Sequence, residues 1–398
     1  MKKFIRYFFH RDHLIITLLA FVLLALFNFI VINVDFLNPI SRALDNFSIT
    51  DMFFEVRHSD EPEACDLITI VDMTDLYERG DIAELIREVD ECNPLCIGVD
   101  LIFEGVRDDY VGNEMLEQTI SDLKSPAVFA NKLTEYNSVS NSFQGIVRTY
   151  CADNCSITDA YTNVTDDMMG SCIREFSLSR LYKDDSVASF PAMIAGIIDN
   201  TTVNYSEEDQ LINYGNVDFR VIPYDSIFEN RDLIEGSIVI IGTMNEERDM
   251  HNTPLGKMAG AKIQAYSLLT LLEHRQVHQI PDIICWIIAY LLCYLLEISI
   301  DIFYQISKAH PNSVFQTFIP EANIISIVFL FVFEVLACWA FYILFIKENL
   351  LMGGGVILAT IVLTCEARDI YMAIIKGFYS KYDNKSFFSK SLMIDDNP

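Results

Sequence analysis

The chain has 398 residues, long enough for two or three ordinary domains, and 52% of its residues are hydrophobic. Together with a positive mean hydropathy of +0.27, this composition argues against an all-soluble protein and predicts that part of the chain lies in lipid. The formal net charge is −28, which argues against a nucleic-acid-binding surface because clustered acids repel phosphate groups.

The first long apolar run covers residues 14–34 and predicts a transmembrane helix. It holds 21 residues without a charge, enough to cross roughly 30 Å of hydrocarbon at about 1.5 Å per residue. A cleaved signal peptide is the alternative, but the run is longer than the usual apolar core and has no A-x-A site, so an uncleaved anchor is favoured. Basic residues precede the run and predict a cytoplasmic N-terminus: Lys2, Lys3, Arg6 and Arg11.

Three further apolar runs near the C-terminal end predict three more spans. The tail beyond them is basic, which predicts that it also lies in the cytoplasm, at Arg368, Lys376, Lys381, Lys385 and Lys390. Four membrane crossings place both the basic N-terminus and the basic C-terminal tail in the cytoplasm. The predicted topology is cytoplasmic N-terminus 1–13, helix 14–34, extracytoplasmic domain 35–282, helix 283–303, cytoplasmic loop 304–321, helix 322–346, outer turn 347–349, helix 350–366 and cytoplasmic tail 367–398.

The predicted exported segment carries nearly all of the net charge. Residues 35–281 contain 17 Lys and Arg against 44 Asp and Glu, a net charge of −27. Such a surface favours cations or basic partners, although the solubility of a tethered domain is the simpler explanation.

In chain order, residues 66–72 form a β-branched apolar run that predicts a buried parallel strand. A helix is expected to begin at Asp81, which has a Glu three residues on, and to end near Pro94. Residues 95–103 predict a second strand, joined to the first by a right-handed crossover and adjacent to it.

The later elements continue this alternation of helix and strand. The patterns predict a helix at 111–123, a strand at 127–133, an irregular or hairpin insertion at 135–163, a helix at 186–198, a strand at 237–243 and a helix at 259–273. The predicted fold class is therefore α/β, an exported domain with a mainly parallel central sheet flanked by helices, plus four transmembrane helices.

Six of the ten cysteines lie in the exported segment, and an even number there predicts disulfides. If the first two strands are adjacent, Cys65 lies close enough to Cys96 or Cys92 for a bridge. No His stands at ligand spacing to the cysteines, so a zinc site is not expected. The candidates are Cys65, Cys92, Cys96, Cys151, Cys155 and Cys172.

Three acids follow predicted strands and mark a candidate ligand site. Ligands bind beyond the carboxyl ends of parallel strands, where a crevice of acids suits a hard cation or a basic ligand. The alternative is that these acids only cap helices and bond loop amides. No catalytic or phosphate-binding motif is present, so neither an enzyme nor a cofactor is expected. The candidate residues are Asp72, Asp100, Glu104, Thr243, Asp249 and Thr253.

Two acids, Glu297 and Glu334, lie inside predicted spans, where a charge costs a few kcal/mol or more. No basic residue lies at the same depth in these spans. Protonation, a hydrogen bond or an external partner is therefore expected, and both residues are candidates for intramembrane coupling. Interfacial placement through helix tilt is the alternative for Glu297.

The order of these segments resembles the CHASE type 2 domain, an extracellular sensory domain associated with cyclases and histidine kinases. The resemblance covers nearly the whole chain. It rests on Asp51-Met-Phe-Phe-Glu-Val-Arg57, Ile68-Thr-Ile-Val-Asp72, Gly98-Val-Asp-Leu-Ile-Phe103, Gly236-Ser-Ile-Val-Ile-Ile-Gly-Thr243, Asp249, Thr253-Pro-Leu-Gly256 and Gly260-Ala-Lys-Ile-Gln-Ala265. Ala259 and Gln264 depart from the common Pro and His of the family.

The resemblance implies a sensor in a bacterial inner membrane, with its large domain in the periplasm or cell exterior. Many relatives continue into an output domain, so a separate membrane or cytoplasmic output protein is expected here. The other expected partners are the lipid bilayer and an unknown ligand or protein, with no nucleic acid and with homo-oligomerisation left open. The alternative is an assembly subunit of a cell-envelope complex.

Overall fold

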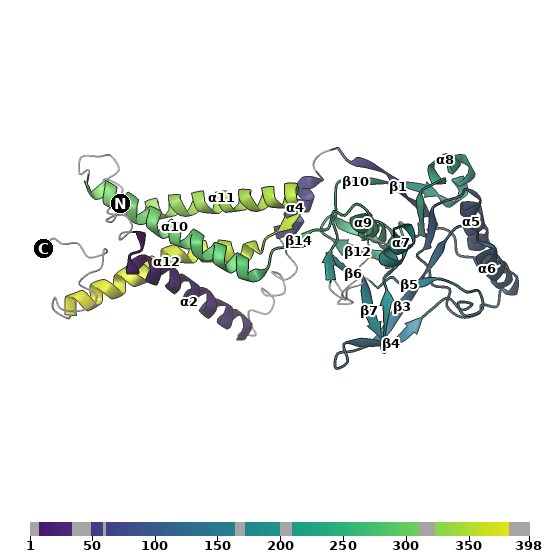
Figure 1. The fold of residues 1–398 in the computed structure, drawn as a ribbon, viewed down its shortest axis with the longest axis horizontal. Coiled ribbons are helices and arrows are strands. Elements are labelled where there is room, and N and C mark those ends of the chain that lie inside the picture. Colours follow the sequence, from purple (N-terminus) through teal and green to yellow (C-terminus); the bar gives the residue numbers. More distant parts are fainter. Residues whose placement is uncertain are drawn as a thin grey trace. The chain divides into compact units, whose positions relative to one another are not determined.

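The computed structural model describes residues 8–33, 49–58, 61–163, 172–199, 209–309 and 323–381. The chain divides into a helical unit, Met1–Ile49 with His278–Pro398, and a globular unit, Thr50–Val277. Figure 1 shows long helices in the first and a sheet with helices on both faces in the second.

Five parallel strands form the centre of the main sheet of the globular unit. Their order across the sheet is β10-β1-β11-β2-β3. The central strands are buried on both faces and rich in Ile and Val, as a parallel sheet covered on both sides requires. Their bounds are β1 (Glu63–Asp72), β2 (Cys96–Val99), β3 (Ala127–Asn137), β10 (Val217–Pro223) and β11 (Ile238–Gly242).

The complete sheet is mixed, so the prediction of a mainly parallel sheet holds only for its centre. The long strand β3 turns back into β4 (Ser142–Val147), and β7 (Ser179–Tyr182) turns back into β8 (Asp185–Ala188), both antiparallel. A tight turn is enough for such hairpins, whereas a parallel pair needs a crossover. β5 (Asp159–Tyr161) pairs in parallel with β3.

The predicted adjacency of the first two strands is wrong, because β11 lies between β1 and β2. Ile240 of β11 pairs with Ile70 on one side and with Gly98 on the other. Neighbouring strands are about 4.8 Å apart, so β1 and β2 are separated by about 10 Å. Because this exceeds the reach of a disulfide, the predicted Cys65–Cys96 bridge does not form.

The other cysteine pairings are not formed either, since all ten cysteines are described and all are free thiols. Cys92 and Cys151 lie in the hydrophobic core, and Cys155 packs against it. Burial raises the pKa of the Cys96 and Cys151 thiols to about 12. These side chains therefore act as small neutral core residues.

Helices cover both faces of the sheet. On one face lie α5 (Arg79–Glu91) and α6 (Tyr110–Asp122), which pack against each other. On the other lie α7 (Phe190–Ile198) and α9 (Gly260–Leu272) (Figure 1). A Cβ on Gly98 would come within 2.7 Å of Phe190 of α7, so the small residue permits this close packing.

Short elements complete the globular unit. Two small antiparallel sheets pair β6 (Glu175–Ser177) with β9 (Asp209–Leu211) and β12 (Met250–Thr253) with β13 (Gly256–Ala259). The remaining helices are α4 (Ile49–Arg57), α8 (Arg231–Ile234) and three 3₁₀ turns, η2 (Tyr224–Ser226), η3 (Phe228–Asn230) and η4 (Glu247–Asp249).

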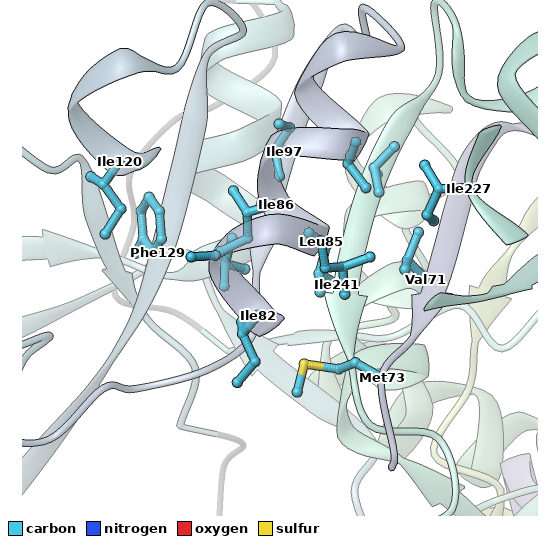
Figure 2. Close-up of a cluster of buried hydrophobic side chains, with 14 of the residues drawn as sticks. Val71, Met73, Ile82, Leu85, Ile86, Ile97, Ile120, Phe129, Ile227 and Ile241 are labelled. Atoms are coloured by element: carbon cyan, nitrogen blue, oxygen red, sulfur yellow. The ribbon is translucent and has the colours of Figure 1, made fainter. Parts of the chain in front are cut away.

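The main core lies between α5, α6 and the sheet. Figure 2 shows Ile82, Leu85 and Ile86 of α5 in the same cluster of buried side chains as Val71 and Ile241 of the central strands. This spacing follows the helical period, so one face of α5 is buried. The helix begins two residues before the predicted Asp81, after Glu78, whose side chain makes no capping hydrogen bond.

The helical unit contains four long helices. α12 packs against each of the other three. A short parallel pair joins β14 (His278–Gln279) to β15 (Leu350–Leu351), at the place of the predicted outer turn. The helices are α2 (Arg11–Asn33), α10 (Asp282–Ala309), α11 (Asn323–Glu348) and α12 (Gly354–Lys381).

Among the described residues, two helices rather than four are long and apolar enough to cross a membrane. They are Asp282–Phe303 within α10 and Ile327–Glu348 within α11. α12 falls short because Glu366, Arg368 and Asp369 interrupt its apolar run. The first predicted span, 14–34, and the predicted loop and tail, 304–321 and 367–398, each extend beyond the described residues.

The buried face of α5 gives a test of this core. We expect Ile86→Ala to lower the thermal unfolding midpoint of the full chain in detergent, because the lost methyl groups leave a cavity costing roughly 2–5 kcal/mol. Circular dichroism measures the midpoint. Val106→Ala is the control, since Val106 is 68% exposed. Equal effects of the two changes would contradict the assignment of Ile86 to the core.

Candidate functional site

The carboxyl ends of the central strands bring two predicted acids into one row. Asp72 at the end of β1 pairs with Gly242 of β11, and Ile241 pairs with Val99 of β2, directly before Asp100. The backbone N–H of Asp100 donates to the carbonyl of Ile241 at 2.9 Å. The two acids therefore flank the end of β11, at the edge where ligands of such sheets bind.

Asp72 is engaged in fixing the loops at this edge. Its Oδ1 accepts hydrogen bonds from the backbone N–H and the hydroxyl of Thr74 and, at 3.2 Å, from the N–H of Met244. The Thr74 hydroxyl accepts from the N–H of Met244 at 3.0 Å and of Asn245 at 3.2 Å. Asp72 thus ties the loop after β1 to the loop after β11, the role that the alternative interpretation gave it.

Asp249 forms a second group with Thr243 and His251. The Thr243 hydroxyl donates to Asp249 Oδ2 at 2.9 Å, and His251 Nε2 lies 3.8 Å from Asp249 Oδ1. A Cβ on Gly260 would come within 2.8 Å of Asp249 Oδ1, so the glycine leaves room for the carboxylate at the start of α9. The N-terminus of a helix favours a negative charge there.

Asp100 interacts electrostatically with Asp249 and His251 of this group. Burial, with a smaller contribution from the nearby Asp249 carboxyl, raises the pKa of Asp100 to about 7, while His251 opposes the shift. Two carboxyl groups at one strand edge disfavour double ionisation. Asp100 and Asp249 therefore form one pair of acids, and Asp72 belongs to a separate loop network.

Two of the predicted residues lie outside this group. Glu104 is exposed, and its described hydrogen bonds are made by the backbone: its carbonyl accepts from Arg79 Nη2 at 2.9 Å and its N–H donates to the carbonyl of Ile102 at 3.1 Å. Thr253 is buried and closes the β12–β13 turn, where its hydroxyl donates to the carbonyl of Gly256 at 2.7 Å. Gly256 has a φ of +95°, which favours glycine in this turn.

Sequence analysis missed Arg79, the largest fully buried side chain among the described residues. Its guanidinium also donates to the carbonyl of Gly105 at 2.7 Å and lies 4.6 Å from the centre of the Tyr150 ring. It lines a cavity of about 150 Å³ at the same edge, together with Arg107 and Glu246. The signal available was an Arg two residues before the predicted start of a helix, a residue type that normally points to solvent.

The geometry does not form a metal centre. Within the described ranges, no group of three or more His, Cys, Asp or Glu side chains is arranged to hold a metal ion. The edge of the sheet therefore holds an acid pair and a histidine, a group suited to proton exchange or to a basic ligand.

The helical unit contains a second polar group, around the predicted coupling residue Glu297. Arg368 Nη1 of α12 donates to Glu297 Oε1 of α10 at 2.6 Å, and Arg368 Nη2 lies 3.7 Å from Asp301 Oδ1. His13 Nδ1 of α2 lies 3.6 Å from Glu297 Oε1, and His13 Nε2 lies 3.9 Å from Asp301 Oδ2. The side chains of Glu297, Asp301 and His13 are at most 1% exposed.

This ionic cluster of His13, Glu297, Asp301 and Arg368 corrects the expectation that Glu297 has no basic partner in the chain. Arg368 was assigned to the cytoplasmic tail, but α12 runs unbroken past it to Lys381. Glu297 and Asp301 stand four residues apart on α10, a spacing that places both on one face of a helix. This spacing was the feature of the sequence that could have indicated a shared site for Glu297 and Asp301.

The second predicted coupling residue, Glu334, is different. It lies on α11, whose apolar segment is only 11% buried. Glu334 is partly exposed and has no ion pair or hydrogen bond to any residue that the structure describes. The two acids therefore have different surroundings, one inside the helical unit and one on its surface.

The globular unit is a three-layer α/β structure with a polar crevice at its strand ends, and apolar helices precede and follow it in the chain. This arrangement fits a ligand-binding domain. The family model of the CHASE2 domain matches residues 16–298, more than half of the chain. The chain therefore belongs to the CHASE2 family, whose domain is extracellular and sensory. Comparison with curated proteins and with solved structures gave no match.

The raised pKa of Asp100 predicts a pH dependence of stability. The folded chain favours the neutral acid, so this contribution is complete below the ordinary value of 3.8 and is lost as the pH rises through about 7. We expect the free energy of unfolding to fall over that range by at most about 1.4 kcal/mol per pH unit.

Asp100→Asn should flatten this pH profile, measured by denaturant unfolding of the full chain at a series of pH values. Asp108→Asn is the matched control, because Asp108 is an exposed acid in the loop after the same strand. An unchanged profile in the Asp100 variant would rule out the shifted carboxyl group as its source.

The ionic cluster predicts a large effect of Arg368→Met. Removing the cation leaves two buried carboxyl groups without their partner, which costs roughly 3–5 kcal/mol. The midpoint of thermal unfolding in detergent should therefore fall, and Glu297→Gln in the same chain should restore part of it. Glu366→Gln, an exposed change on the same helix, serves as the control. A midpoint equal to that of the control would show that the ion pair is not formed.

Proposed function

We propose that this chain is a membrane-anchored sensor of a bacterial inner membrane, whose globular unit lies outside the cytoplasm. It binds a ligand or protein there and passes the signal to a separate output protein, without catalysing a reaction itself. The family supports sensing, and the two apolar helices long enough to cross a bilayer support anchoring. One observation supports transmission, namely the way in which the two ends of the globular unit are joined.

A single buried amide, Asn213, joins these two ends. Arg57 Nη1, at the end of α4, donates to Asn213 Oδ1 at 2.7 Å. Asn213 Nδ2 donates to the backbone carbonyl of Arg275 at 2.8 Å, shortly before α10 begins at Asp282. We call Arg57, Asn213 and Arg275 the junction. A shift of either end changes the bonds available to the other, because the amide has one carbonyl and one NH₂ group.

The helix that carries Arg57 is firmly held in the globular unit. Asp51 accepts two hydrogen bonds from Arg174, at 3.0 and 2.7 Å. Phe54 is 2% exposed and meets the Tyr214 ring edge to face. Asp51, Phe54 and Arg57 are the residues of the first family-like stretch of the sequence, so this stretch docks α4 and positions the junction.

Signal passage through the helical unit is proposed to use the ionic cluster. Glu297 and Asp301 lie on α10, which follows the junction in the chain, and Arg368 lies on α12. A rotation or shift of α10 would break charge-assisted bonds to α12, which makes two discrete arrangements of the helices energetically distinct. Glu334, on the exposed surface of α11, is proposed to contact a helix of the output protein.

Identification of the partner tests the proposed function. We expect the full chain, extracted gently from native membranes, to retain a signalling enzyme such as a cyclase or a kinase, identified by mass spectrometry. Recovery of envelope-building proteins instead would favour the assembly role and contradict sensing.

The junction gives a second test, made on the retained complex. Asn213→Leu keeps the volume but removes both hydrogen bonds, at a cost of about 1–3 kcal/mol. We expect the partner to stay bound while its activity changes several-fold. Asn245→Leu, an exposed position, should change neither. If Asn213→Leu leaves the activity of a folded complex unchanged, the junction does not transmit the signal.

A further inference from the structure

A second cavity of the globular unit lies against α9 and the residue that follows α4. Its volume is about 470 Å³, within the range of small-molecule sites. Its walls come from His58 after α4, the start of β10, the loop after β11, the β12–β13 hairpin and the first turns of α9. Segments far apart in the sequence thus meet around one space.

The cavity is locally basic in a strongly acidic domain. Residues 35–281 contain 44 acids and only five lysines, yet Lys257 and Lys262 both line this cavity. The structure describes no carboxylate within 4.0 Å of either ammonium group. By contrast, Arg148, Arg174, Arg180 and Arg220 each pair with an Asp. A single acid, Asp218, shares the cavity with the two lysines.

His58 also indicates excess positive charge at this end of the cavity. Burial lowers the pKa of its imidazole, the backbone of Tyr214 and Gly215 offsets part of the shift, and Lys262 and Arg57 lower it further. The two charged groups among the main causes of this shift are both cations, although the domain is rich in acids.

The rest of the lining is apolar and adaptable. Met244, Met250 and Met258 contribute thioether side chains from three different segments, and the ring of Tyr266 lies beside them. The Tyr266 hydroxyl is already engaged, donating to the carbonyl of Val217 at 3.2 Å. Methionine fits ligands of varied shape and packs well on aromatic rings. A ligand for this cavity combines an anionic group with a hydrocarbon body.

We propose that this cavity binds a small organic acid, with its carboxylate on Lys257 and Lys262 and its hydrocarbon part on the methionines. This inference rests on the proposed sensory function and names the class of ligand. His58 follows Arg57 of the junction directly, and α9 carries Thr270, whose hydroxyl accepts from the N–H of Asn213 at 3.0 Å. The ligand therefore contacts α9 and the residue that follows α4, which both lie next to the junction.

Binding is measured on the full chain in detergent by titration calorimetry and by the thermal unfolding midpoint. The probes are benzoate and hexanoate, with benzamide and hexanamide as uncharged analogues and inorganic phosphate as the anion without a hydrocarbon body. We expect the two carboxylates to bind with millimolar or better affinity and to raise the midpoint, since such affinities suit ligands of roughly ten atoms. The amides and phosphate should bind at least about tenfold more weakly.

Variants locate the site. Lys257→Met and Lys262→Met should each weaken carboxylate binding at least about tenfold, because each removes a charge-assisted hydrogen bond. Lys132→Met is the matched control, an exposed lysine outside the cavity. No binding of either carboxylate, or binding unchanged in the double lysine variant, overturns the proposal. Carboxylate binding by a chain that retains no signalling enzyme would leave the site intact and refute only the sensory function.

Discussion

The position of β11 between β1 and β2 is the constraint on which the globular unit depends. This strand hydrogen-bonds on both sides and is buried on both faces. It ends at Gly242, where a Cβ would come within 2.7 Å of Ala261 of α9. The positions of the strand ends, of the acid pair and of α9 therefore all depend on a late segment of the chain that lies at the centre of the sheet.

α9 connects the functional features of the globular unit. Asp249 lies against its first residue, and Lys262 and Tyr266 line the basic cavity. Near the other end, Thr270 bonds Asn213 of the junction. The helix is buried along nearly its whole length, so it cannot adjust one contact by exposing another. A rigid buried helix that touches a cavity and a junction is a suitable element for coupling the two.

The helical unit follows a different physical rule. In the globular unit, acids are abundant and most lie in water, where a charge costs little. In the helical unit, Glu297 and Asp301 are buried among apolar helices, and only the pairing with Arg368 and His13 makes their burial tolerable. Breaking this cluster costs free energy. It therefore holds α2, α10 and α12 in one arrangement unless a comparable free energy is supplied.

Local patterns in the sequence determined the elements that depend on periodicity and composition. The runs at 66–72 and 237–243, the helix at 259–273 and the apolar character of α10 and α11 could all be predicted, because burial imposes its period on neighbouring residues. Tertiary structure decided what depends on distant partners. The insertion of β11 removed the predicted disulfide, the mixed sheet arose from hairpins, and Arg79 and Arg368 became buried partners. Such pairings join residues far apart in the chain. A local sequence pattern does not show which distant side chain will pair with a buried charged residue.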